Sequence, residues 1–218
     1  GLVEHAVDGT SYDPAGAVSG FSHGPQTAGV LDLAKVCALC NQAVVRHVDG
    51  KYERVGEPTE AALKVLVEKI GLPDAPRPTD PALACSAANG RWMDAHPCQA
   101  ILEFSRDRKS MSVLCGRAQT NGGARAKSPA RSKSPGRAKS PPKRRGGAAH
   151  MLYVKGAPES VLARCTRARL ADGSTVALSA AQRKSILANV AKMAARPLRC
   201  LAMAVGEDVG ELAEYDGP

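Results

Sequence analysis

Apolar residues recur at helical spacing in three stretches of the chain, and each stretch predicts a helix with one apolar side. The first stretch is 27–40 and the second is 56–71. The third begins after Ser179, which forms a capping-box pattern with Gln182. The apolar positions at helical spacing in the first stretch are Val30, Leu31, Ala34, Cys37 and Leu39. In the second stretch, Leu63, Leu66, Val67 and Ile70 are expected to form a buried stripe, and in the third Ile186, Leu187, Val190 and Ala194 lie on one side of the helix.

Two further segments predict shorter or less regular helices. One runs from Asp80-Pro81 to about His96 and is weakened by Gly90. The other follows Lys155-Gly156-Ala157-Pro158 and reaches about Cys165. Proline in the first turn of this second segment is typical of a helix start.

Short runs of β-prone residues between turn dipeptides predict strands. Asp49-Gly50 and Asp172-Gly173 each indicate a hairpin, and 152–154 and 198–205 indicate single strands. Because strands and helices are mixed and several strands are joined by hairpins, we predict an α+β fold with an antiparallel sheet flanked by helices.

The central stretch 101–115, ILEFSRDRKSMSVLC, has apolar ends and a cationic middle, so it predicts two strands around a charged turn. Phe104 stands at the border between the first strand and the cations Arg106, Arg108 and Lys109. An aromatic ring beside cations suits a ligand with a flat base and a phosphate tail. The alternative is that Phe104 belongs to the core and that the cations form a solvated turn.

Lys155 lies where a predicted strand turns into a helix. Such a junction offers free backbone N–H groups and the positive end of a helix dipole beside an ammonium group, which favours an anion or an electron-rich ring. Many strand-to-helix turns with this pattern bind nothing, so both interpretations stay open on these residues alone.

Length and composition allow one large domain or two small ones. The 218 residues are 44% apolar and only 3% aromatic, so the core must consist mostly of Ala, Val and Leu. No run of about 18 apolar residues and no signal peptide is found, and the start at Gly1 without Met leads us to expect an excised fragment. The seven Cys are scattered, so we expect free thiols in a reducing compartment. Cys37 and Cys40 form a CxxC pair without a second pair at zinc-like spacing, and no metal site is predicted.

The net charge of +9 belongs to one segment. Residues 116–149 contain ten Lys and Arg and no acid, and the remainder of the chain has 20 basic and 21 acidic residues. This segment cannot bury enough apolar surface to order itself, so we predict a disordered loop. Ser128-Pro129, Ser134-Pro135 and Ser140-Pro141 recur in it, each preceded by Lys, which indicates possible phosphorylation sites for proline-directed kinases. A solvated insertion without function is the alternative.

Four motifs in order resemble the nucleotide-binding domain of P-type ATPases, and within that group the sarco/endoplasmic-reticulum type of calcium pump. They are VGEPTEAAL (55–63), EFSRDRKSMSV (103–113), YVKGAPESVLARC (153–165) and LRCLAMA (198–204). CALCN (37–41) and LVEKIG (66–71) extend the likeness. With this resemblance we divide the chain into a leading segment 1–25, a single nucleotide-binding domain 26–205 interrupted by the basic loop 116–149, and an acidic exit segment 206–218.

The resemblance implies roles for eight residues, all in ATP binding and none in catalysis. Phe104 matches the residue that stacks on adenine, Lys155 the lysine at the base of the adenine pocket with Gly156 beside it, and Glu60 an acid near the adenine edge. The remaining matches are Arg106, Lys109 and Arg199, which would face the phosphates, and Leu201, which would be a pocket wall.

The resemblance also implies that the parent protein is a calcium-transporting ATPase of the endoplasmic reticulum, with this part on the cytosolic side. Its partners would be ATP and the phosphorylation and actuator domains of the pump, and the fragment would be a monomer. No Asp in an Asp-Lys-Thr-Gly context occurs, nor a GxxxxGK[ST] or GxGxxG loop. We therefore expect ATP binding without hydrolysis, with Mg²⁺ needed by the parent enzyme but not bound by this domain alone, and a Kd on the order of 0.1–1 mM.

Two other functions remain as alternatives. A nucleic-acid or anionic-surface binding module acting through the basic loop would lose binding steeply with salt and completely on deletion of 116–149. A free-standing kinase would need a catalytic Asp motif and a metal-binding set, and neither is found.

Overall fold

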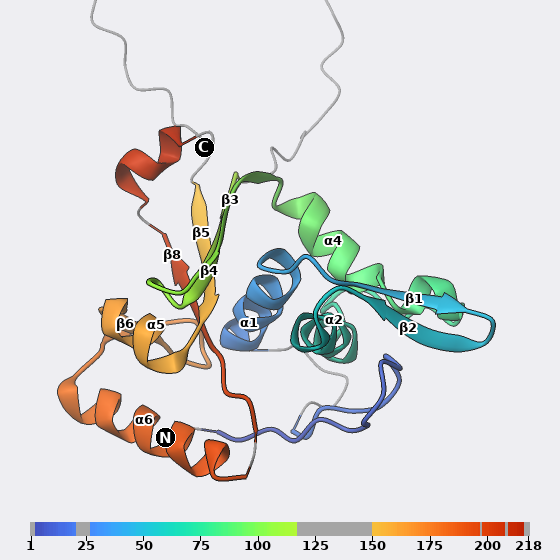
Figure 1. Ribbon diagram of the computed structural model, residues 1–218, viewed down its shortest axis with the longest axis horizontal. Helices are drawn as coiled ribbons and strands as arrows, with labels where there is room; N and C mark the ends of the chain where they lie inside the picture. Colours follow the sequence, from blue (N-terminus) through green and yellow to red (C-terminus); the bar gives the residue numbers. More distant parts are fainter. Residues whose placement is uncertain (1–2, 21–26, 117–149, 197, 208, 216–218) are drawn as a thin grey trace, which may run out of the picture.

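A four-stranded antiparallel sheet with the order β3-β4-β5-β8 forms the centre of the computed structural model, which describes residues 3–20, 27–116, 150–196, 198–207 and 209–215. Its strands are β3 (Cys98–Ser105), β4 (Ser110–Cys115), β5 (Met151–Gly156) and β8 (Ala202–Gly206) (Figure 1). Two hairpins form separate sheets: β1 (Val44–Val48) with β2 (Lys51–Val55), and β6 (Arg167–Arg169) with β7 (Thr175–Ala177). The α+β fold class predicted from the sequence is therefore confirmed, but its strands do not all join one sheet.

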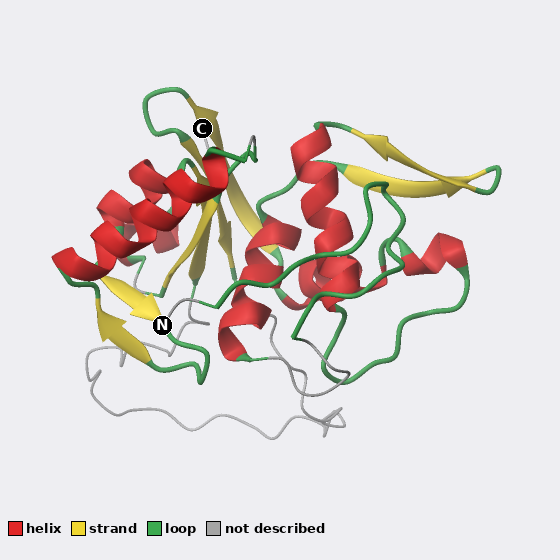
Figure 2. Cartoon of the chain, turned by 90° about the horizontal axis from the view of Figure 1, so that it is seen from below, coloured by secondary structure: helices red, strands yellow, loops and turns green. Residues whose placement is uncertain are grey.

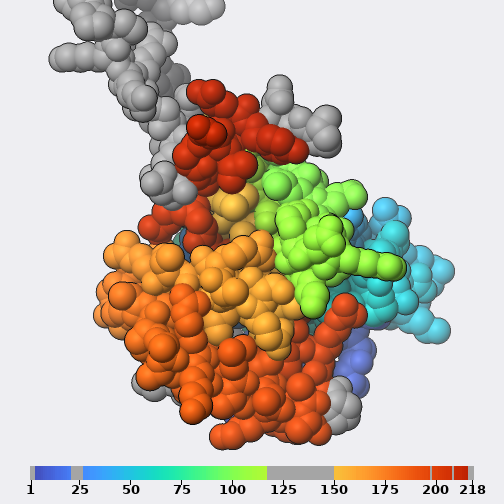
Figure 3. Space-filling view, turned by 60° about the vertical axis from the view of Figure 1, so that its left-hand side comes forward, coloured from blue at the N-terminus to red at the C-terminus, as the bar shows by residue number. Residues whose placement is uncertain are grey.

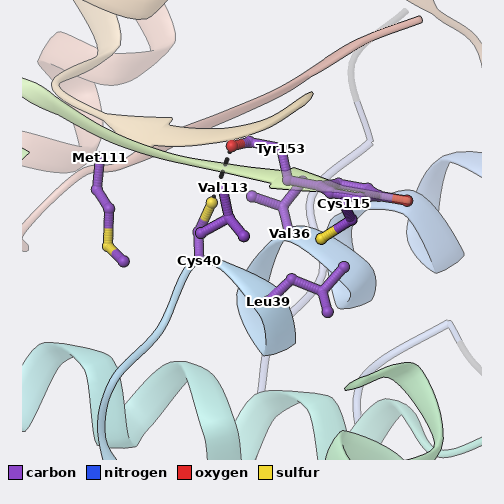
Figure 4. Packing of buried hydrophobic residues seen from close by; sticks show 7 residues of the cluster. All are labelled: Val36, Leu39, Cys40, Met111, Val113, Cys115 and Tyr153. Atoms are coloured by element: carbon purple, nitrogen blue, oxygen red, sulfur yellow. Dashed lines mark hydrogen bonds between the residues drawn. The ribbon is translucent and has the colours of Figure 1, made fainter. Parts of the chain in front are cut away.

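Helix α1 (Ala28–Leu39) covers one face of the central sheet. Their common core is a buried cluster of Val36, Leu39, Cys40, Met111, Val113, Cys115 and Tyr153 (Figure 4). The thiol Sγ of Cys40 donates a hydrogen bond to the Tyr153 carbonyl at 3.0 Å. This contact ties the end of α1 to the middle of the sheet.

Behind α1 lies a second helical layer of α2 (Pro58–Ile70), α3 (Pro81–Ala84) and α4 (Ala87–Ala95), with the β1–β2 hairpin packed on α2. Helices α5 (Pro158–Arg164) and α6 (Ala180–Ala194) lie on the other side of the sheet with β6 and β7. Figure 2 shows the sheet between these two groups of helices. The helices expected to flank the sheet are thus confirmed.

The turns of the hairpins follow local residue chemistry. Asp49 and Gly50 both have positive φ, of 49° and 77°, and Val48 pairs with Lys51 across them. This geometry is typical of the two-residue turn that an Asp-Gly pair favours. The hairpin predicted around Asp49-Gly50 is confirmed, and so is the one around Asp172-Gly173.

Three predicted elements differ from the structure. The irregular helix expected over 80–96 is divided into α3 and α4 at Cys85 and Ser86, where Ser86 has a non-helical ψ of −2° at a φ of −146°. The strand expected over 198–205 begins only at Ala202, where pairing with Gly156 starts. The exit segment contains a short 3-10 helix, η1 (Gly210–Glu214), which Gln99 of β3 holds by hydrogen bonds to the Ala213 and Tyr215 carbonyls.

All seven cysteines are free thiols. Of the two in the CxxC pair, Cys37 packs towards Val67 and Cys40 towards the sheet. No helix in the described ranges is long and apolar enough to cross a bilayer.

Candidate nucleotide-binding site

One end of the central sheet gathers most of the residues predicted to bind nucleotide. Ser105 pairs with Ser110, Ser110 with Gly156, and Gly156 with Ala202, so these residues form a row across all four strands. Phe104, Lys109, Lys155 and Leu201 each lie next to a member of that row in the sequence. Residues separated by about 100 positions in the chain therefore meet at this edge.

An open groove of about 540 Å³ runs along β3 at this end of the sheet. Its size falls within the range of ligand pockets. Phe104 is 63% exposed in the groove, so its ring face is available to a ligand. The lining residues are Gln42, Ile101, Leu102, Glu103, Phe104, Ser105, Arg108 and Tyr215. In Figure 3 the β3 and β4 residues, in green, stand on the surface beside the yellow and orange residues of β5 and α5.

The groove lies at this edge because β3 is the outer strand of the sheet and its pairing with β4 is irregular near the end of β3. The register between β3 and β4 shifts between Leu102 and Ser105, so Phe104 lies in the irregular part of this pairing. Ser105, next to Phe104, pairs with Ser110, which pairs with Gly156, next to Lys155. With neighbouring strands about 4.8 Å apart, the backbones at Ser105 and Gly156 are roughly 10 Å apart.

Glu60 and Lys155 form an ion pair at the base of this edge. Lys155 Nζ donates to Glu60 Oε1 at 2.8 Å, and the lysine is only 7% exposed. Partial burial alone would raise the pKa of Glu60. Hydrogen bonds from Lys155 and from backbone N–H groups, together with the ammonium charge, outweigh that effect and hold the pKa of Glu60 below its usual value. The carboxylate therefore stays ionised at neutral pH.

Gly156 has no room for a side chain. A Cβ at this position would come closer than 3 Å to the Lys109 carbonyl and to the Ser110 side chain. The absent side chain lets Ala157 N–H donate to the Lys109 carbonyl at 2.9 Å, which joins the start of α5 to the β3–β4 turn. The glycine thus keeps the turn and the Lys155 strand together.

The cations of the β3–β4 turn differ in where they lie. Arg108 lines the groove, and its Nε donates to Ser105 Oγ at 3.2 Å. Arg106 and Lys109 are exposed in the turn, and Lys109 has a positive φ of 49°. Arg199 is exposed and Leu201 is half-buried in the segment before β8. Only Phe104 of the eight predicted residues lines the groove itself.

Seven of the eight residues that line the groove were not among the predicted site residues, and Arg108, Gln42 and Tyr215 are three of them. Arg108 lies inside the FSRDRKS motif, two residues after Arg106. This spacing within a cationic motif is the sequence signal that could have indicated Arg108 as a site residue. Gln42 and Tyr215 come from segments about 60 residues before and 110 residues after Phe104, and nothing local in the sequence indicates that they reach this groove.

Other predicted features fall outside this site. Ser128, Ser134 and Ser140, and the basic loop that carries them, lie outside the described residues. Within the described ranges, no group of three or more His, Cys, Asp or Glu side chains is arranged to hold a metal ion.

Comparison with known proteins adds an independent line of evidence. The family model described as P-type ATPase, cytoplasmic domain N, matches residues 29–127 and 138–216. The chain is 36% identical over 215 residues to calcium-transporting ATPase 4, endoplasmic reticulum-type, of Arabidopsis thaliana. The matched region covers 97% of the chain and 17% of that protein. It is 34% identical over 221 residues to calcium-transporting ATPase 2, endoplasmic reticulum-type, of the same plant, covering 96% of the chain and 18% of that protein. It is 34% identical over 225 residues to the endoplasmic reticulum calcium ATPase srcA of Aspergillus fumigatus, covering 96% and 20% respectively. The chain spans about a fifth of the length of these relatives.

Proposed function

The chain belongs to the family of cytoplasmic N domains of P-type ATPases, and from that premise we propose that it binds ATP in the groove beside Phe104 and presents it to a phosphorylation domain. The parent protein would be a calcium-transporting pump of the endoplasmic reticulum, with this domain on the cytosolic side. The names of its relatives, which are endoplasmic-reticulum calcium ATPases, support this assignment.

The observation that carries the proposal is the exposed ring of Phe104. An aromatic side chain that is 63% exposed contributes little to the core, and in this groove its apolar surface is free to be covered by a ligand. A nucleobase stacked on an aromatic ring is stabilised by about 1–3 kcal/mol. The purine would lie on Phe104, with the Glu60–Lys155 pair at the base of the same sheet edge.

The phosphate chain would extend towards the cations of the site. Arg108 lies in the groove, and Arg106 and Lys109 are exposed in the adjoining turn. Arg199 would reach the phosphates from the segment before β8. Guanidinium and ammonium groups bind phosphate oxygens through charge-assisted hydrogen bonds, but at half-exposed positions each contact is weak. A Kd on the order of 0.1–1 mM follows.

The domain would bind ATP without hydrolysing it, because neither a phosphoryl acceptor in an Asp-Lys-Thr-Gly context nor a carboxylate set for Mg²⁺ is among its proposed site residues. In the parent enzyme, hinge motion would carry the terminal phosphate, with Mg²⁺, to the aspartate of the phosphorylation domain.

The test is an ATP titration of the 218-residue chain by calorimetry, followed by NMR shift changes if binding is weak. We expect binding in the stated range and a loss of about 5- to 100-fold in Phe104→Ala. Leu83→Ala is the control, because Leu83 is 58% exposed on α3 and does not line the groove. No binding at several millimolar ATP, or equal affinity in wild type and Phe104→Ala, would reject the proposal.

A further inference from the structure

Gln42 brings an amide side chain to the groove from the loop between α1 and β1. The other lining residues come from β3, the turn after it and the C-terminal segment. The residue is exposed, and among the described residues its side-chain amide has no hydrogen-bond partner. A side chain that offers a donor and an acceptor therefore lines the same groove as Phe104.

The backbone on both sides of Gln42 is held in place. Asn41 donates through Nδ2 to the carbonyls of Cys37 at 3.0 Å and Glu60 at 2.8 Å. Its Oδ1 accepts from Ala43 N–H at 2.9 Å. Asn41 is itself buried. The amide of Gln42 is thus presented from a loop whose position is set before any ligand arrives, which lowers the entropy cost of a contact.

Glu60 supports Gln42 from behind. Its Oε1 accepts from Lys155 Nζ at 2.8 Å, and its Oε2 accepts from the backbone N–H of Gln42 at 3.0 Å. Each carboxylate oxygen therefore accepts one hydrogen bond from the protein. Through these two contacts Glu60 joins the Gln42 loop to Lys155 on β5 and holds the loop in place.

We propose that the side-chain amide of Gln42 contacts the edge of the bound purine, accepting from the 6-amino group through Oε1 and donating to the neighbouring ring nitrogen through Nε2. This inference rests on the proposed function, because it needs a purine stacked on Phe104. A planar amide offers one donor and one acceptor side by side, which is the complement of the adenine edge. Gln42 is then a residue that determines base preference, and Glu60 is a positioning residue.

A cycle of two proteins and two ligands tests the contact. The proteins are the wild-type chain and Gln42→Met, which keeps the length of the side chain and removes its hydrogen bonds. The ligands are ATP and purine riboside triphosphate, which lacks the 6-amino group. We expect loss of the amino group to weaken binding about three- to tenfold in wild type and by less than twofold in Gln42→Met.

A second variant shifts the base preference from adenine towards guanine. Gln42→Glu replaces the donor by a second acceptor, which suits the N1–H and 2-amino donors of guanine and opposes the ring nitrogen of adenine. The ratio of ATP affinity to GTP affinity should fall at least threefold relative to wild type. Gln42 is exposed, so thermal denaturation should show that both variants remain folded.

The outcomes separate this inference from the proposed function. If ATP binding depends on Phe104 but loss of the 6-amino group weakens wild type and Gln42→Met equally, the Gln42 contact is wrong and the proposed function stands. If the wild-type chain binds no ATP, both are wrong.

Discussion

Lys64 is a charged side chain in the core of the helical layer. It is 6% exposed on α2, and its Nζ donates to the Ala38 carbonyl near the end of α1 at 2.8 Å. Burial lowers the pKa of Lys64 to about 8, although the charges of Glu60 and Glu68 oppose that shift. The ammonium group is therefore held in the folded state at a cost in free energy.

This lowered pKa makes stability depend on pH. The unfolded chain binds the proton of Lys64 up to about pH 10.5, whereas the folded chain releases it near pH 8, so stability rises between these values as pH increases. The free energy of unfolding of wild type relative to Lys64→Met should increase from pH 7.5 to 9.5, by up to about 1.4 kcal/mol per pH unit. Urea denaturation at several pH values measures the difference.

Two features of the chain define the control for this experiment. Burial raises the pKa of Cys37, Cys40 and Cys115 to about 12, which lowers stability above about pH 9. The charge of Lys64 contributes to the Cys37 shift, so the effects of Cys40 and Cys115 are the ones that are common to wild type and Lys64→Met and are removed by subtraction. The exposed Lys51→Met variant should follow wild type at every pH. A flat difference between wild type and Lys64→Met would contradict the prediction.

Burial of single residues on α2 was only partly predictable. The expected positions Val67 and Ile70 are buried, whereas Leu63 and Leu66 are half-buried. The charged Glu68 is buried because it accepts from the backbone N–H groups of Ala88 and Asn89 on α4. Helical periodicity indicates which side of a helix is apolar, but the partners that stabilise a buried charge come from another helix.

At the scale of elements, α6 depends on its own sequence more than the other helices do. None of the side chains in Ala180–Ala194 is buried. At its start, Gln182 N–H donates to Ser179 Oγ at 3.2 Å and Ser179 N–H donates to Gln182 Oε1 at 2.8 Å. The predicted capping box is confirmed. It gives hydrogen-bond partners to the backbone N–H groups of Ser179 and Gln182, which would otherwise be left to water.

Ser179→Ala should therefore loosen the first turns of α6. We expect a loss of about 1 kcal/mol of helix stability, because the side chain that accepts from Gln182 is removed. Hydrogen exchange of the α6 amides is the measurement, since local opening of an exposed helix need not change global unfolding. Ser185→Ala, in the exposed middle of the helix, should leave exchange unchanged or slower. Equal exchange in wild type and Ser179→Ala would show that packing on α5 alone holds the helix.

Elements were predicted best where local residues decide them. The capping box, the Asp-Gly turn and the Pro at helix starts each place a boundary within one or two residues. Which strands share a sheet depends on distant pairing, so the separate β1–β2 and β6–β7 sheets were not foreseen. The late start of β8 has the same cause, because the strand begins where Gly156 offers a partner.

At the scale of the whole molecule, the site exists only because distant segments meet at one sheet edge. Glu60 and Lys155 are 95 positions apart in sequence and form an ion pair. Motif resemblance placed Glu60 and Lys155 in one set of candidate residues, whereas the pattern of apolar and polar residues gave no reason to group them. Gln42 and Tyr215 stand outside the motifs that carry the resemblance to the binding pocket, which is why they were missed.

The basic loop can be separated from the proposed ATP site by deletion. Cys115 at the end of β4 pairs with Met151 at the start of β5, so a short Gly-rich turn can replace 117–149 without stretching either strand. Removing ten positive charges changes the net charge from +9 to about −1. We expect the deletion variant to keep its thermal stability and to bind ATP within about threefold of wild type, because none of the residues that line the groove is removed. If the wild-type chain binds nucleic acid or anionic vesicles, that binding should fall steeply with salt. The deletion variant should lose it. Loss of ATP binding on deletion would assign nucleotide affinity to the loop and contradict a pocket built on Phe104 and Lys155.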